Sequence, residues 1–149
     1  MNPQRSDQGS AAIEFVAVGV LLMVPLIYLI VTMSRVQAAS FAADSSAREA
    51  ARALVTAVDE EDGRRRAAIA VRLGLLDQGF TEPRDVKLVV ECASNDCLTP
   101  GDRVRVRVEI RVALPVIPRF ISGALSTDVT VRAAQMAVVD EFRATGATS

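Results

Sequence analysis

Histidine and tryptophan are absent from this chain, lysine occurs once, at Lys87, and cysteine occurs twice. Without histidine, the Ser-His-Asp and Cys-His nucleophile pairs are excluded, and so are imidazole ligands for a metal ion. No Gly-rich phosphate loop and no clustered pair of carboxylates takes their place. We therefore expect a protein that is not an enzyme, with no catalytic residues, no metal and no cofactor.

A basic excess is also missing, because the formal net charge is −1. A general nucleic-acid-binding protein carries clusters of Lys and Arg that neutralise phosphates. The three arginines at residues 64–66 are one candidate cluster, but acids one turn earlier explain them as a solvated helix face. Nucleic acid is therefore not an expected partner.

Apolar residues are abundant and are concentrated near the N-terminus. Half of the chain is hydrophobic, and residues 15–31 contain no charged side chain. With the neighbouring residues 11–13 and 32–34, this run reaches the ~20 residues that a helix needs to cross a bilayer. Pro25 lies inside it, as is common in membrane helices, and predicts a modest bend. We predict a transmembrane helix over residues 10–34.

Two other interpretations of the apolar run stay open. The stretch VQAAS at residues 36–40 has the small residues that signal peptidase accepts, which is compatible with a cleaved secretory signal. Against cleavage, the run is longer than the usual ~7–15 apolar residues of a signal peptide. The second alternative is an uncleaved signal anchor that presents an extracytoplasmic ligand-binding or interaction domain.

Alanine-rich sequence continues the apolar run, without Pro or Gly, from residue 36 to residue 57. Because alanine is the strongest helix former, the membrane helix is predicted to extend outward, forming a rod of roughly 70 Å. Small residues recur along it at steps of three and four, which predicts a stripe that permits close packing. This small-residue stripe consists of Ala39, Ala43, Ala47, Ala50, Leu54 and Ala57.

A second helix is predicted from Asp59, its N-cap, to Gly79, where it ends. Acids in its first turn precede arginines by one turn, which predicts three ion pairs at i,i+4. These pairs join Glu60 with Arg64, Glu61 with Arg65, and Asp62 with Arg66. Ile69, Leu73 and Leu76 follow the helical repeat and are predicted to form the buried stripe of this helix.

Alternating apolar residues predict three strands after the second helix. The first covers residues 86–92 and the second residues 103–114, where apolar residues alternate with a row of arginines. The third covers residues 128–139, with a shift of parity near Ala133 and Ala134 that predicts a bulge. An irregular crossing is predicted before the third strand and a frayed tail after it. The arginine row is interpreted as the solvated face of a small antiparallel sheet.

The two cysteines, Cys92 and Cys97, are close in sequence, and the second lies in a turn-rich loop. Two cysteines without histidine make a poor structural metal site, which usually needs four ligands. We therefore predict a disulfide between them, which places the domain in an oxidising compartment. Two reduced thiols are the remaining alternative.

The start of the apolar run carries the sequence GSAAIEF. Gly9 is followed by four residues and then by Glu14 and Phe15, directly ahead of the uncharged segment. This pattern resembles the processing site of prepilins, and in particular that of the TadE-like minor pilins, or pseudopilins, of the tight-adherence (Tad/Flp) type IV pilus system. The stretch AREAAR at residues 47–52 is also similar to that family. The later part of the chain resembles it only in its helix-plus-sheet layout and its two cysteines.

The resemblance implies that a membrane prepilin peptidase cleaves between Gly9 and Ser10. It divides the chain into a leader, 1–9, a transmembrane helix, 10–34, and an extracytoplasmic α+β domain, 35–149. The implied partners are the membrane, the prepilin peptidase, other pilin and pseudopilin subunits, and the pilus assembly platform. The implied location is the cytoplasmic (inner) membrane, as a single-pass protein with a cytoplasmic N-terminus, with entry into a surface pilus as a further option.

A carboxylate inside hydrocarbon is costly, so Glu14 needs either a partner or a place at the surface. Cleavage would expose the ammonium group of Ser10, which can pair with Glu14 of a neighbouring subunit in a stack of helices. Glu14 and Phe15 are therefore predicted to set the register between subunits, and a Glu14 at the headgroup level is the simpler alternative. The expected fold class is α+β and pilin-like, with a long N-terminal helix, a second helix and a three-stranded antiparallel sheet.

Overall fold

The computed structural model of the chain describes residues 7–80, 86–113 and 128–143. These parts contain two helices and three strands, which are α1 (Asp7–Val55), α2 (Glu60–Asp77), β1 (Val86–Cys92), β2 (Arg103–Ala113) and β3 (Asp128–Val138). The predicted α+β class is confirmed, with a long apolar helix, a second helix and an antiparallel sheet. Most of the predicted leader and the predicted irregular crossing lie outside the described residues.

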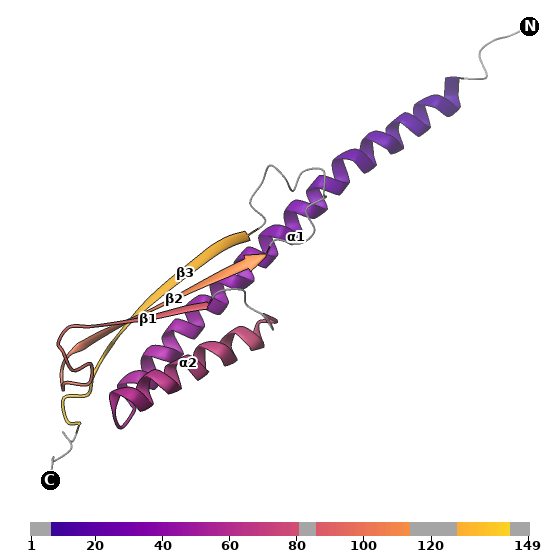
Figure 1. The fold of residues 1–149 in the computed structure, drawn as a ribbon. Coiled ribbons are helices and arrows are strands. Elements are labelled where there is room, and N and C mark those ends of the chain that lie inside the picture. Colours follow the sequence, from indigo (N-terminus) through magenta and orange to yellow (C-terminus); the bar gives the residue numbers. More distant parts are fainter. Residues whose placement is uncertain (1–6, 81–85, 114–127, 144–149) are drawn as a thin grey trace, which may run out of the picture.

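The first helix, α1, is continuous over 49 residues, which confirms that the apolar run extends into the alanine-rich segment. At ~1.5 Å per residue its length is roughly 70 Å. The helix continues through Pro25 without a break. Figure 1 shows its N-terminal half projecting alone, whereas its C-terminal half lies along the sheet and α2. The molecule is therefore a folded domain with a long helical extension.

The three strands form one antiparallel sheet in the order β1-β2-β3. The central strand supplies the buried core face, through Val104, Val106, Val108, Ile110 and Val112. The pairing of β2 with β3 is uninterrupted from Arg103 opposite Val138 to Ala113 opposite Asp128. The prediction of a bulge near Ala133 and Ala134 is therefore wrong.

Gln135 is a polar residue on the inward face of β3. Its amide Nε2 donates a hydrogen bond to Oδ1 of Asp44 on α1, 2.7 Å away. Because this bond satisfies the polar group, the strand keeps its regular alternation without a bulge. Met136 and Val138 consequently point outward and are 61% and 58% exposed.

The arginine row of β2 lies on the outer face of the sheet, as predicted, and cross-strand ion pairs connect it with the two neighbouring strands. Arg107 pairs with Glu91 of β1, with 3.2 Å between nitrogen and oxygen. Arg132 of β3 pairs with Glu109 at 2.9 Å. These pairs are solvent-exposed, so each stabilises the sheet by less than about 1 kcal/mol.

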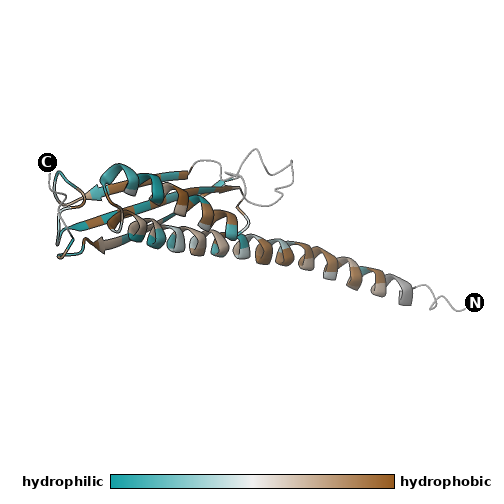
Figure 2. Cartoon of the chain, turned by 90° about the horizontal axis from the view of Figure 1, so that it is seen from below, coloured by the Kyte–Doolittle hydropathy of each residue, from teal (hydrophilic) through white to brown (hydrophobic). Residues whose placement is uncertain are grey.

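The two helices cover the other face of the sheet, and α2 runs back beside α1 (Figures 1 and 2). The predicted small-residue stripe of α1 is confirmed, since all six of its residues are buried. On α2 it meets a ridge at steps of four, formed by Gly63, Ala67, Val71 and Leu75. A Cβ atom at Gly63 would lie 2.8 Å from Cδ1 of Leu54, so the helices approach closely at this point.

The predicted buried stripe of α2 is wrong. Ile69, Leu73 and Leu76 are 53%, 55% and 40% exposed. The smooth alanine surface of α1 is complementary to a ridge of smaller residues, and this ridge-into-groove packing fixes the rotation of α2 about its axis. The larger apolar residues of the same helix are thereby turned away from α1.

Both predicted ends of α2 are confirmed. The side chain of Asp59 accepts a hydrogen bond from the backbone N–H of Asp62 at 2.8 Å. Gly79 has a positive φ of 78°, which glycine adopts without steric cost. The backbone N–H groups of Gly79 and Phe80 donate to carbonyls of the last turn, both at 2.9 Å, as in a Schellman motif.

Two of the three predicted ion pairs in α2 are confirmed. Glu60 pairs with Arg64 at 2.7 Å, and Asp62 pairs with Arg66 at 2.6 Å. Arg65 pairs with Asp62 at 2.5 Å instead of with Glu61. Asp62 accepts from both arginines because i,i+3 and i,i+4 neighbours lie on one side of a helix.

The chain that follows β3 returns to the end of α1. Arg143 donates hydrogen bonds to the carbonyl oxygens of Val55, at 3.2 Å, and Val58, at 2.5 Å. Carbonyls at a helix C-terminus lack intrahelical partners and attract cations. The predicted frayed tail is therefore wrong for residues 141–143, and residues 144–149 lie outside the described part.

Candidate functional site

The projecting half of α1 has an apolar surface that the folded domain does not cover. Residues 15–34 contain no Asp, Glu, Lys or Arg. An apolar window of this helix is long enough to cross a membrane, and none of it is buried. Leu21 and Leu29 are 73% and 63% exposed, and Figure 2 shows the hydrophobic colour along this half. A bilayer, not water, is the solvent that suits such a surface, so α1 fits a single-pass membrane protein.

Two charged residues bracket this apolar length. Glu14 precedes it and Arg35 follows it. The ~20 residues between them span about 30 Å, which is the thickness of the hydrocarbon core of a bilayer. The two charges therefore lie at the two surfaces of a membrane that contains this segment.

At the Arg35 end of the apolar segment, α1 contacts the folded domain. The guanidinium carbon of Arg35 lies 4.6 Å from the centroid of the Phe80 ring. Phe80 follows the C-terminus of α2 and is only 6% exposed. This cation–π contact, worth about 0.5–1 kcal/mol, holds the domain close to the end of the apolar segment.

The predicted processing and register residues lie together at the start of α1. Gly9 and Ser10 are in its first turn. Glu14 is exposed and Phe15 is 80% exposed. Positions 10 and 14 are one turn apart and share a face of the helix. Within the described residues, Glu14 has neither a hydrogen bond nor an ion pair.

The predicted disulfide joins Cys92, the last residue of β1, to Cys97, with 5.0 Å between their Cα atoms. Cys97 is 4% exposed, and the guanidinium of Arg64 on α2 lies 3.7 Å from its sulfur. Figure 1 shows the loop between β1 and β2 at the end of the domain opposite the projecting half of α1. The structure therefore separates the disulfide from Glu14 by the length of the molecule.

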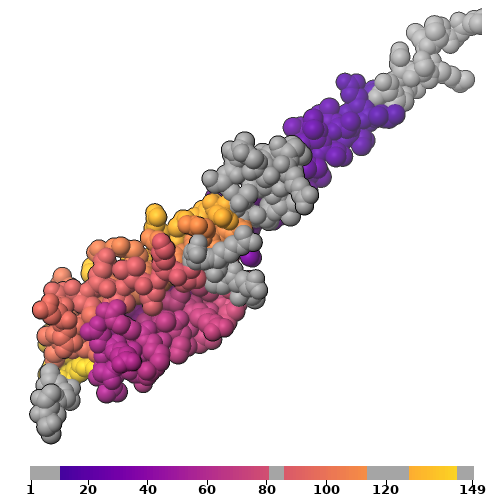
Figure 3. Space-filling model, viewed as in Figure 1, coloured from indigo at the N-terminus to yellow at the C-terminus, as the bar shows by residue number. Residues whose placement is uncertain are grey.

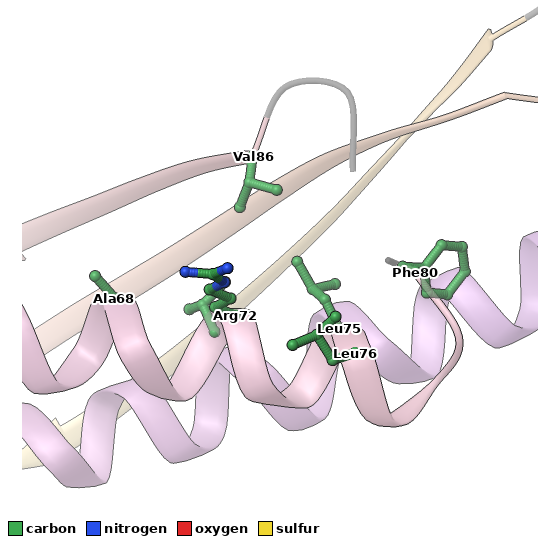
Figure 4. Close-up of a pocket in the computed structure, with 7 residues that line it drawn as sticks. Ala68, Arg72, Leu75, Leu76, Phe80 and Val86 are labelled. Carbon is green, nitrogen blue, oxygen red and sulfur yellow. The ribbon is translucent and has the colours of Figure 1, made fainter. Parts of the chain in front are cut away.

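The folded domain also contains an apolar groove that sequence reasoning did not single out. It has a volume of about 280 Å³ and lies between α2 and β1. Figure 4 shows Arg72 extending from α2 toward the side of β1 that carries Val86. Arg72 is the one charged side chain in its described lining. Specific ligand sites normally combine an apolar lining with several converging polar groups, which this groove lacks.

In the described part of the chain, no three His, Cys, Asp or Glu side chains come together as a metal site. The expectations of no metal, no cofactor and no enzymatic activity stay predictions. The chemistry visible in the structure is that of an apolar helix with one carboxylate at its edge.

Comparison with known proteins gives one family. Residues 9–52 match the TadE-like protein family. The match begins at Gly9 and includes Glu14, the apolar segment and the AREAAR stretch. No curated protein and no solved structure matches the chain. The resemblance seen in the N-terminal motif is thus confirmed over residues 9–52, where the chain is similar to the TadE-like family.

Proposed function

We propose that this protein is a membrane-inserted minor pilin, or pseudopilin, that takes part in assembly of a Tad/Flp adhesion pilus. One observation carries the proposal. Gly9 and Glu14 stand at the edge of an uncovered apolar helix, inside the segment that matches the TadE-like family. A single apolar span and a separate folded domain are the parts that a membrane-anchored subunit needs.

In this proposal, prepilin peptidase hydrolyses the peptide bond between Gly9 and Ser10. The products are a leader that ends in the carboxylate of Gly9 and a subunit that begins with the ammonium group of Ser10. That ammonium lies one helical turn from Glu14, at the mouth of the apolar segment. Processing therefore creates a positive charge beside a negative one, both at the membrane boundary.

The pair sets the axial register between subunits. When Glu14 of one subunit binds the Ser10 ammonium of its neighbour, the two helices are displaced by four residues, or about 6 Å. Other displacements leave both charges without a partner in a medium of low dielectric constant. The partners in this step are other pilin and pseudopilin subunits and the assembly platform.

The test of processing is the N-terminal mass of the protein extracted from its native membranes. We expect a chain that begins at Ser10, and a Gly9→Val variant that keeps its full length. A chain that begins near Ser40 would identify a discarded secretory signal. An unprocessed wild-type chain would identify an uncleaved anchor and favour the ligand-binding alternative.

The test of register is a Glu14→Gln variant that is still processed. We expect loss of pilus assembly, because the amide cannot neutralise the ammonium group of a neighbour. Glu61→Gln, on the exposed face of α2, is the matched control and should assemble normally. Normal assembly of the Glu14→Gln variant would overturn the register role and leave Glu14 as a headgroup-level residue.

A further inference from the structure

The second helix has two apolar faces, of which only one is packed within the chain. The packed face contacts α1. The other face carries Ile69, Leu73 and Leu76, which are 53%, 55% and 40% exposed and are here called the outer stripe. Single exposed apolar residues are ordinary, whereas three aligned on one helix face form an apolar stripe that a partner can cover.

The spacing of the outer stripe is that of a helix–helix seam. Its steps are four and then three residues, which correspond to positions d, a and d of a heptad. In the same heptad register Arg72 occupies a g position and Asp77 the following e position. Both side chains are exposed, and within the described residues neither has an ion-pair partner. The stripe is therefore flanked by a cation on one side and an anion on the other.

We propose that the outer stripe packs against the same stripe of a second copy of this chain, with the two α2 helices parallel. The inference rests on one part of the proposed function, the anchoring of both copies in the same membrane through α1. Two copies with the same membrane topology are related by an axis along the membrane normal. Because α2 runs beside α1 (Figure 1), this axis makes the two α2 helices parallel and excludes an antiparallel pair.

The flanking charges are complementary in this arrangement. In a parallel seam, a g residue of one helix meets the following e residue of the other, five positions later. Arg72 of each copy therefore meets Asp77 of the other copy, which gives two ion pairs per dimer. An antiparallel seam centred on Leu73 would instead bring the two Arg72 side chains together.

The seam is short, with three apolar residues from each copy, and is weak between freely diffusing molecules. Confinement to one bilayer raises the effective concentration of the two copies, so that a weak contact is occupied for a larger fraction of the time. The experiment therefore uses the full-length protein in membranes.

The first test is disulfide crosslinking of full-length variants with one introduced cysteine. The two native cysteines are bonded to each other, so the new thiol is the free one. We expect Ile69→Cys and Leu76→Cys each to form dimers under mild oxidation, because d positions face their equivalents in a parallel, in-register seam. Ala68→Cys, an exposed c position outside the a/d seam, is the control and should stay monomeric. Absence of dimers from both stripe variants, or crosslinking to a different protein, would overturn the proposal.

The second test exchanges the flanking charges in the Ile69→Cys background. Arg72→Asp and Asp77→Arg should each reduce dimer yield about five-fold, because attractive pairs become repulsive ones. The double exchange should restore the yield, since it reverses both members of each pair. A double variant as weak as the single variants would contradict the parallel seam.

The failure of this inference is distinguishable from the failure of the pilin proposal. Crosslinking in vesicles that contain only this protein requires neither processing nor a pilus. A Glu14→Gln variant should therefore dimerise normally through the outer stripe, even where pilus assembly is lost.

Discussion

At the scale of single residues, the close packing of α2 against α1 depends on two glycines. A Cβ atom at Gly63 would lie 3.1 Å from the carbonyl oxygen of Leu54, and one at Gly74 would lie 2.5 Å from Oγ of Ser46. Ser46 is 1% exposed, and its hydroxyl has no hydrogen-bond partner in the described part of the chain. The low helix propensity of glycine is accepted at these positions because a larger residue has no room.

Gly74→Ala is predicted to destabilise the domain by about 1–3 kcal/mol, because the new methyl group overlaps the Ser46 hydroxyl. Thermal unfolding of the full chain in mild detergent measures the loss. Ser46→Ala should be neutral or stabilising by itself, since it removes a buried hydroxyl without a partner. The double variant should recover most of the loss, because the methyl groups then meet at an ordinary distance. If Gly74→Ala alone and Gly74→Ala with Ser46→Ala are equally unstable, the clash does not involve the Ser46 hydroxyl.

At the scale of elements, α2 has the predicted helical periodicity but buries a different face from the predicted one. The largest residues that follow the helical repeat predict a buried face of Ile69, Leu73 and Leu76. Packing selected the residues whose shape fits α1, and these include Gly63 and Ala67. The predicted alanine stripe of α1 is confirmed, because its small side chains let the ridge of α2 approach closely.

The observed buried face of α2 predicts a large loss of stability for one leucine of this helix and a small loss for another. Leu75→Ala should lower the free energy of unfolding by about 2–4 kcal/mol, because Leu75 is 1% exposed and its removal leaves a cavity. Leu73→Ala should cost less than about 1 kcal/mol in dilute detergent solution, because Leu73 is 55% exposed. Urea unfolding of both full-length variants is the measurement. A larger loss for Leu73→Ala would mean that α2 is rotated relative to the structure.

The loop between β1 and β2 is predicted to depend on its disulfide. Replacing Cys92 and Cys97 by serine should lower the free energy of unfolding by about 2 kcal/mol, which is the chain-entropy effect of so short a loop. Dithiothreitol should lower the melting temperature of the wild type to that of the double serine variant. Dithiothreitol should leave the double serine variant unchanged. A double serine variant that unfolds at the same temperature as the wild type would refute a stabilising role.

At the scale of the whole molecule, the two ends of the chain are chemically distinct. The uncovered apolar half of α1 is at one end, and the disulfide loop and the Arg143 contact with Val55 are at the other (Figure 3 shows the free helix leaving the domain). The charge-free segment suits lipid, whereas a disulfide persists in an oxidising compartment. We therefore expect the folded domain on the extracytoplasmic side.

Fusion of reporters to the C-terminus tests this orientation. Alkaline phosphatase, whose disulfides form only outside the cytoplasm, should be active on the full chain. A green fluorescent reporter exported by the same route should stay dark. A Leu22→Arg and Ile27→Arg double variant is the control, since two charges in the apolar segment should prevent insertion and reverse both readouts. An inactive phosphatase on the wild type would reverse the proposed topology.

The sequence by itself determined the α+β class of the molecule and the apolar segment that is long enough to span a membrane. Charge-free length, alanine content, strand alternation and helix caps are local properties, so α1, both ends of α2, the three strands and the Gly9–Glu14 motif could all be read from it. The tertiary structure alone decided which face of α2 is buried, that β3 is regular, and that Arg143 caps α1. Each of these depends on the shape or the hydrogen-bonding groups of a residue distant in sequence. Gln135 stays inward because Asp44 is there to accept its hydrogen bond, and no local pattern contains that information.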